Sequence, residues 1–200
     1  MDDNSKKLLV AIADFLFLAV LTVAAPLIVY VDAVWIGHGV PECSATEITQ
    51  ETLLLLSALL FWIEARRRPQ DRAFFILVGG FLACMFLREV DFLFDPIHHA
   101  FWILPVAITA VVCAAPALTH RQAALQSAAN FMNQRSCIYI SVGLLIAIVF
   151  SRIFGSGHLL WNHLLGEAYK SQYKSIIQEG LELFGYLFIF YGACLVRRDR

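Results

Sequence analysis

The side chains with the clearest capacity for chemistry in this sequence are carboxylates that recur at short spacings. Glu179 and Glu182 are three residues apart, and Glu89 and Asp91 are near neighbours in another segment. Residues three or four apart share one face of a helix. Carboxylates that crowd together away from water have raised pKa values, which suits proton transfer. We therefore predict general acid and base roles for Glu51, Glu89, Asp91, Glu179 and Glu182.

Histidines accompany these carboxylates and add ligands of the kind that zinc, iron or manganese accept. The predicted metal ligands are His98, His99, His163 and Glu167. The sequence has no H-E-x-x-H, and Glu179-Gly180-Leu181-Glu182 lacks the histidine of the E-x-x-H di-iron motif. A bound divalent metal is therefore one of three interpretations. The others are a proton or cation pathway and a purely structural polar network.

Two arginines are the only basic side chains expected near the five carboxylates. Guanidinium groups bind phosphate through paired, charge-assisted hydrogen bonds. We predict that Arg88 and Arg152 hold an anionic group of a substrate, such as a lipid phosphate. The alternative for Arg152 is that it only neutralises one carboxylate.

These polar side chains are embedded in an unusually apolar chain. Its 200 residues are 60% hydrophobic and 16% charged, with a mean hydropathy of +0.70. Soluble domains are about 45–50% apolar and about 25% charged. The apolar residues form blocks of roughly 18–24, about the length that a helix needs to cross a bilayer. This composition excludes a soluble enzyme, a secreted disulfide scaffold and a disordered chain.

We predict an all-α bundle of six transmembrane helices, in one membrane domain that covers residues 1–200. Helices are expected because lipid offers no partner to free backbone groups. The expected spans are Leu8–Val31, Ile48–Ala65, Ala73–Phe94, Ala100–Leu118, Cys137–Phe154 and Ile176–Val196. Charged groups inside a bilayer cost about 2.5–3.5 kcal/mol each, so they normally mark function or pair with one another.

The distribution of basic residues predicts the orientation. With a cytoplasmic N-terminus, eleven of the fifteen lysines and arginines fall on the inner side. Basic residues concentrate on the cytoplasmic side of membrane proteins. Both termini are therefore expected inside, in an arrangement that fits a bacterial inner membrane. The predicted catalytic carboxylates and metal ligands then lie toward the outer side.

Asp14 stands apart from the other acids, two turns into the first predicted span. One interpretation makes it the inner station of a proton relay. The other lets it reach interfacial water or an arginine.

Two of the predicted helices begin with similar sequences. Residues 48–55 and 176–183 share the pattern I-x-Q-E-x-L-x-L at the outer end of their spans. Leucine matches are common in membrane helices, but Gln-Glu at the same depth is not. We therefore expect the first and last hairpins to be related copies, with two independent helices of similar outer ends as the alternative.

The leading functional hypothesis is a cation- or metal-binding site that opens to the extracytoplasmic face and acts on a lipid or lipid-linked substrate. One alternative is a small, oligomeric transporter or channel for protons or cations, and another is an accessory membrane subunit. No nucleophile elbow, Walker loop or dinucleotide fingerprint is present. The net charge of −1 indicates no nucleic-acid partner. The expected partners are the lipid bilayer and further copies of the chain.

Overall fold

The computed structural model of this protein describes residues 2–36, 44–94, 96, 98, 100–166 and 171–198. Every regular element in these residues is a helix, so the all-α prediction is confirmed. The elements in chain order are α1 (Asp3–Tyr30), η1 (Val31–Ile36), α2 (Ala45–Arg67), α3 (Arg72–Glu89), η2 (Asp91–Leu93), α4 (Ile103–Thr119), α5 (Arg121–Met132), α6 (Arg135–Leu144), η3 (Leu145–Phe150), α7 (Ser151–Phe154), η4 (Gly157–Trp161), α8 (Asn162–Leu165) and α9 (Ser171–Leu195). The segments η1, η3 and η4 are π-helical, and η2 is a 3₁₀ turn.

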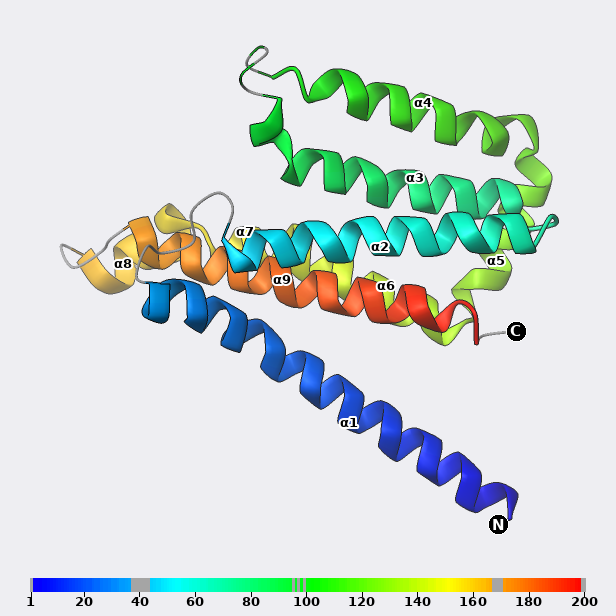
Figure 1. The fold of residues 1–200 in the computed structure, drawn as a ribbon, viewed down its shortest axis with the longest axis horizontal. Coiled ribbons are helices and arrows are strands. Elements are labelled where there is room, and N and C mark those ends of the chain that lie inside the picture. The colour runs from blue at the N-terminus through cyan, green and yellow to red at the C-terminus, as the bar shows by residue number, and fades with distance from the viewer. Residues whose placement is uncertain are drawn as a thin grey trace.

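The long helices form a layered bundle in which α2 is central (Figure 1). Helix α2 packs against α3 on one side and α9 on the other, while α4 lies beyond α3 and α6 packs along α9. Helix α1 contacts mainly α9 and diverges from the bundle toward its N-terminus. The described N- and C-terminal ends of the chain lie toward the same end of the molecule in this view.

Three continuous helices are long and apolar enough to cross a membrane: Asn4–Ile36, Ala45–Arg67 and Arg135–Phe154. Helices α4 and α5 together make a fourth candidate if the bent pair is one span. Neither α3 nor α9 is among these candidates, although six spans were predicted. Within its 18 residues, α3 carries Arg72, Arg88 and Glu89, which lower its apolar character.

Helix α5 is an element that the sequence did not predict. It follows α4 at an angle of 100°, in a segment expected to be a simple connection between two spans. The hydroxyl of Ser127 on α5 donates to the Asp71 carboxylate at 2.7 Å, which fixes the helix to the turn between α2 and α3. Phe131 packs edge-on against Phe61 and Phe75.

The N-terminus of α2 receives two side-chain caps. Ser44 accepts a hydrogen bond from the Glu47 amide at 3.2 Å, a local cap. Asp32 arrives from η1 and accepts from the amides of Ala45 and Thr46 at 3.0 and 2.7 Å. Asp32 is only 1% exposed, and its buried carboxylate accepts hydrogen bonds from these two amides and from the Thr46 hydroxyl. This contact joins the end of the first helix to the start of the second.

Glycines set the distance between α6 and α9. A Cβ atom on Gly185 would lie 2.7 Å from the Gly143 carbonyl oxygen, and one on Gly143 would lie 2.5 Å from that of Gly185. Small residues of this kind allow helix backbones to approach closely. Gly180, one turn earlier in α9, has more room, because a Cβ there would meet only a methyl group of Val29 at 3.4 Å.

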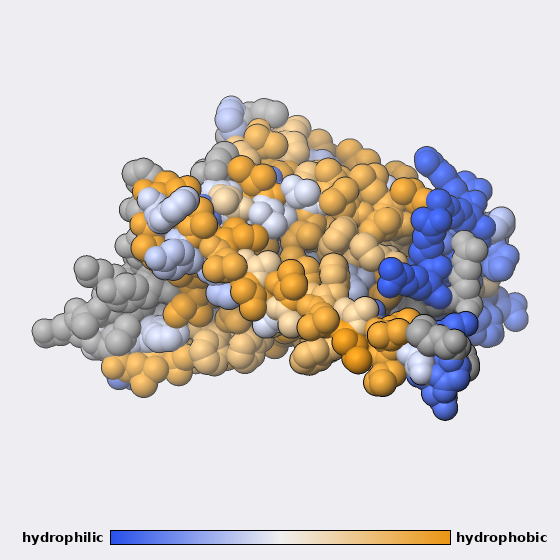
Figure 2. Space-filling view, turned by 60° about the horizontal axis from the view of Figure 1, so that its bottom comes forward, coloured by the Kyte–Doolittle hydropathy of each residue, from blue (hydrophilic) through white to orange (hydrophobic). Residues whose placement is uncertain are grey.

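The surface divides sharply by polarity. Strongly hydrophilic side chains gather at one end of the molecule, and apolar side chains cover much of the visible middle (Figure 2). The start of α1, the end of α2, the start of α3 and the C-terminal end of the chain lie toward this end (Figure 1), and we call it the basic end because these segments carry Lys6, Arg66, Arg72 and Arg197. Within the candidate span that contains α1, only 6% of the apolar window is buried, so most of its side chains face the surroundings.

Candidate functional site

The centre of the candidate site is a contact between α9 and α3. The Tyr186 hydroxyl donates a hydrogen bond to Oε1 of Glu89 at 2.7 Å. Tyr186 is 3% exposed, and Glu89 is half-buried at the last residue of α3. A buried tyrosine hydroxyl normally requires a partner, and here the partner is a carboxylate. This bond holds the Glu89 side chain against α9.

A second contact joins α9 to α2. Nε2 of Gln50 donates to the carbonyl oxygen of Glu179 at 2.9 Å and to its carboxylate at 3.3 Å. Gln50 is completely buried, and its Oε1 atom has no hydrogen-bond partner among the described residues. The two copies of the repeated Gln-Glu pattern therefore meet. They do so asymmetrically, because Gln178 of the second copy donates to Glu182 at 3.1 Å.

Glu182 is the most enclosed carboxylate of the set, with 2% exposure. Its Oε1 atom also lies 3.4 Å from the Ser151 hydroxyl and 3.4 Å from Nη2 of Arg152, both on α7. This ion pair agrees with the alternative in which Arg152 neutralises a carboxylate, with Glu182 as its partner. Most of the Arg152 side chain (61%) stays exposed, so the guanidinium group still faces outward.

Arg88 pairs within its own segment. Its Nη1 atom lies 2.5 Å from Oδ2 of Asp91, and its guanidinium carbon lies 5.1 Å from the centre of the Trp102 ring. The Arg88 side chain is 54% exposed. The ion pair and the cation–π contact hold the guanidinium group in one region without enclosing it.

Glu51 is the carboxylate with the fewest contacts. It is half-buried on α2 and makes no hydrogen bond or ion pair within the described residues. It lies close enough to Glu89 for charge repulsion. Glu89, Glu179 and Glu182 also lie within electrostatic range of one another. The structure thus gathers Glu51, Glu89, Glu179 and Glu182 from three helices, and Asp91 lies beside them as the partner of Arg88.

An open groove of about 280 Å³ lies beside Glu89, at the edge of this cluster. Both arginines, Arg88 and Arg152, line it together with Glu89 and Tyr186. The remaining lining is largely apolar and comes from α3 and the π-helical segment η3. Irregular π-helical turns are frequent at functional sites, and η3 directly precedes the helix that carries Arg152. The groove can therefore receive an anionic group beside an apolar body.

The predicted metal ligands are not brought together in the described part of the chain. His98 and His163 are both exposed. No group of three histidine, cysteine, aspartate or glutamate side chains with metal-site geometry occurs among the described residues. His99 and Glu167 lie outside the described residues, so the metal site stays a prediction.

Asp14, the predicted inner station of a proton relay, has an arginine partner. Its Oδ2 atom lies 2.9 Å from Nη2 of Arg135, at the start of α6. This ion pair agrees with the alternative in which Asp14 reaches an arginine. It also links the diverging helix α1 to the bundle.

Several contributors to the site were not identified as functional from the sequence. Ser151 and Gln178 both bond to Glu182, and Gln50 bonds to Glu179. The shared Gln-Glu pattern was a usable signal for the two glutamines, because polar amides at the same depth of two apolar helices are expected to find partners. Ser151 had no comparable signal.

No family model, curated protein or solved structure matches this chain. A function for this chain is therefore argued from the geometry of its own residues.

Proposed function

We propose that this protein is a six-helix membrane protein with both termini in the cytoplasm and the carboxylate cluster at the extracytoplasmic end. The basic end supports this orientation, since basic residues concentrate on the cytoplasmic side. In this arrangement α3 and α9 also cross the membrane, covered by neighbouring helices. The compartment that fits best is a bacterial inner membrane.

We further propose that the groove binds the phosphate of a lipid or lipid-linked substrate and carries out acid–base chemistry on it. The observation that carries this proposal is the presence of Arg88 and Arg152, both more than half exposed, in one groove with otherwise largely apolar walls. Arginine suits phosphate recognition because its planar group donates paired hydrogen bonds. The apolar walls suit the hydrocarbon part of the same molecule.

In this proposal Glu89 is the general acid or base. It lines the groove, and the hydrogen bond from Tyr186 fixes its Oε1 atom, while its Oε2 atom makes no hydrogen bond within the described part of the chain. Efficient proton transfer requires such a positioned group within hydrogen-bond reach of the substrate. Glu51, Glu179 and Glu182 surround Glu89 and supply further sites for protons or a cation.

Binding and turnover are tested separately with dioleoyl phosphatidic acid. Native mass spectrometry of the purified full-length protein measures the binding of this lipid. Phosphorus NMR of mixed micelles measures any chemical change at the lipid phosphate, which we call turnover. The Arg88→Gln/Arg152→Gln variant should bind this lipid at least about tenfold more weakly. Glu89→Gln should keep binding and lose turnover. Arg66→Gln/Arg197→Gln, which removes the same two positive charges from exposed positions outside the groove, is the control. Unchanged lipid binding in the double arginine variant would reject the proposal.

The orientation is tested by labelling single cysteines in a cysteine-free background. A membrane-impermeant thiol reagent added outside intact cells should label Asn162→Cys on α8. It should label Gln126→Cys on α5 only after the membrane is opened. The reverse pattern would contradict the proposed orientation.

A structural role for the cluster is the second candidate, favoured by a specific set of bonds. Tyr186–Glu89, Gln50–Glu179 and Arg152–Glu182 each join two different helices. If the network only joins helices, each carboxylate variant should lower the unfolding temperature in proportion to its loss of function. A folded but inactive Glu89→Gln variant distinguishes the catalytic role from this one.

A further inference from the structure

A second cleft lies at the opposite end of the molecule, where the basic residues gather. It encloses about 410 Å³ between the turn after α2, the start of α3, the end of α4 and the start of α5. Its lining includes Arg72, Ile76, Pro116 and His120. None of these residues takes part in the candidate site described above.

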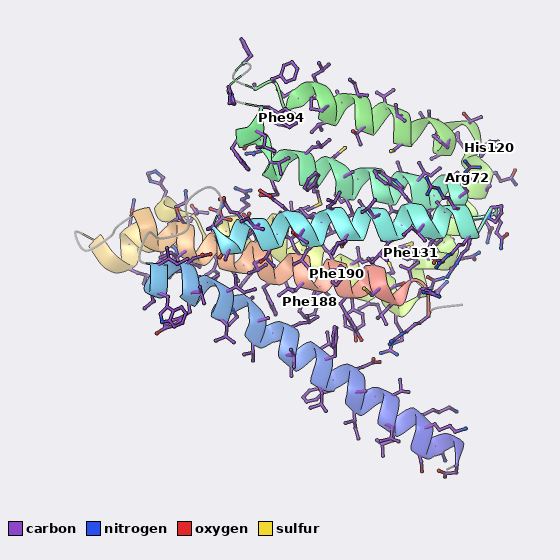
Figure 3. All side chains as sticks on the ribbon, in the orientation of Figure 1. Arg72, Phe94, His120, Phe131, Phe188 and Phe190 are labelled. Carbon is purple, nitrogen blue, oxygen red and sulfur yellow. The ribbon has the colours of Figure 1, made fainter. Side chains whose placement is uncertain are left out.

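The cleft is lined by one arginine and one histidine, and neither has a counter-ion among the residues that the structure describes. Arg72 is the first residue of α3, and His120 is the junction between α4 and α5 (Figure 3). Both are exposed, and neither forms an ion pair within the described residues. The carboxylate next to Arg72 in sequence, Asp71, accepts instead from the Ser127 hydroxyl at 2.7 Å. The described lining of the cleft therefore offers a guanidinium group and an imidazole and contains no carboxylate.

The starts of two helices can supply backbone hydrogen-bond donors beside these side chains. Helices α3 and α5 both begin at the cleft, and neither has a side-chain hydrogen bond at its N-cap residue. By contrast, Ser44 and Asp32 cap the start of α2. The first backbone amides of an uncapped helix need an external acceptor and form the positive end of its dipole.

The remaining lining makes the expected ligand amphipathic. Ile76, Pro116 and Ala73 supply apolar wall beside the charged groups. A second, largely apolar pocket of about 270 Å³ lies on α3, α4 and α5 and includes Arg121. Basic pockets between transmembrane helices on the cytoplasmic side bind the headgroups of anionic lipids.

We propose that the cleft at Arg72 and His120 binds the phosphate headgroup of an anionic phospholipid in the cytoplasmic leaflet. The leaflet follows from the orientation proposed above, whereas the binding itself does not depend on the function of the outer groove. The lipid phosphate would accept hydrogen bonds from Arg72, from His120 and from the first-turn amides of α3 and α5. Its acyl chains would continue along the apolar wall.

The test measures how many phosphatidic acid molecules the protein binds, and where. Delipidated full-length protein is titrated with dioleoyl phosphatidic acid and followed by native mass spectrometry, with dioleoyl phosphatidylcholine as the comparison lipid. The Arg72→Gln/His120→Gln variant should bind one of its phosphatidic acid molecules at least about tenfold more weakly than the wild type does. Arg66→Gln, which removes the same formal charge from the same end outside the cleft, should bind like the wild type. Because the changed side chains are exposed, the unfolding temperature should stay unchanged.

The two lipid sites are distinguished by their own variants. Arg88→Gln/Arg152→Gln tests the outer groove, and this variant should bind phosphatidic acid at Arg72 and His120 as the wild type does. Wild-type lipid binding by Arg72→Gln/His120→Gln would overturn the present proposal. Binding of inorganic phosphate at this cleft without any binding of phosphatidic acid would also overturn it, because the ligand would then be a free anion.

Discussion

Tyr186 and Glu89 are 97 positions apart in the chain and share a hydrogen bond of 2.7 Å. The tyrosine hydroxyl is buried on α9, and the carboxylate stands at the end of α3, where the open groove begins. This bond fixes the orientation of the one carboxylate that lines the groove together with both arginines. The site thus depends on how α9 packs beside α3.

Removing the Tyr186 hydroxyl tests whether Glu89 must be held in place for turnover. Tyr186→Phe should lower the free energy of unfolding by about 1 kcal/mol, because Glu89 loses its donor. Turnover should fall while the binding of phosphatidic acid remains. Thermal unfolding in detergent and the phosphorus NMR assay measure the two effects. Full turnover in this variant would show that the bond does not position Glu89.

Substitution of Glu51 tests its function with little expected change in the stability of the protein. Glu51→Gln removes a carboxylate that makes no hydrogen bond within the described residues, so the unfolding temperature should change by less than that of Glu179→Gln. We expect both variants to lose function while folded protein remains in the membrane. Wild-type activity in both would exclude these two residues from the mechanism.

The metal prediction is tested with the same residues. Elemental analysis of the purified protein, beside the Glu51→Gln/Glu179→Gln double variant, measures zinc, iron and manganese. Near-stoichiometric metal that is lost in the variant would establish a metal site. Equal metal content in both proteins would place any bound metal away from these carboxylates.

Two glycines on α9 provide a matched pair for helix packing. Gly185→Ala should destabilise the protein by about 1–3 kcal/mol, because its Cβ would lie 2.7 Å from the Gly143 carbonyl oxygen. Gly180→Ala should be neutral or stabilising, since the new methyl group meets only Val29 at 3.4 Å and alanine favours the helix. Unfolding curves of both variants check this difference. Equal effects would contradict the close approach of α6 and α9.

The role of Asp14 is tested by a double-mutant cycle with Arg135. The pair is separated by 2.9 Å, but Arg135 is 55% exposed, so we expect a coupling of at most about 1 kcal/mol. Proton flux into liposomes should be the same for the wild type and Asp14→Asn if the pair is structural. Loss of a measurable flux in Asp14→Asn would instead support the relay and the transporter alternative.

Asp32 gives the strongest expected effect on stability. Asp32→Ala would leave the amides of Ala45 and Thr46 without their acceptor, at a cost of about 1.5–3 kcal/mol for hydrogen bonds to a charged group. Asp32→Asn keeps one acceptor oxygen and should lose less. Hydrogen exchange at Ala45 and Thr46 should accelerate in Asp32→Ala. Unchanged exchange would show that Ser44 alone caps α2.

Much of the helical framework followed from local sequence. The predicted span Ile48–Ala65 lies within α2, and nearly all of the predicted span Ile176–Val196 lies within α9. Apolar content determines these segments because the free energy of removing side chains from water depends on each residue and its near neighbours. The charges that end the apolar runs also indicated that the carboxylates would gather at one depth. The bend into α5 escaped prediction, because a short helix of low apolar content gives no span signal.

The partners of the charged groups were decided by tertiary structure. The sequence placed Arg152 near five carboxylates, but the packing of α7 on α9 selected Glu182. No partner for Asp32 was predicted from the sequence, and the packing of η1 beside α2 made it a cap of α2. Such contacts depend on the rotation of each helix about its axis and on the approach that Gly143 and Gly185 permit. The sequence by itself determined that this chain is helical and where its charges lie along each helix. Only the packing of the helices decided which charges meet, because hydrogen bonds and ion pairs require contact at about 3 Å and apolar periodicity does not fix positions that closely.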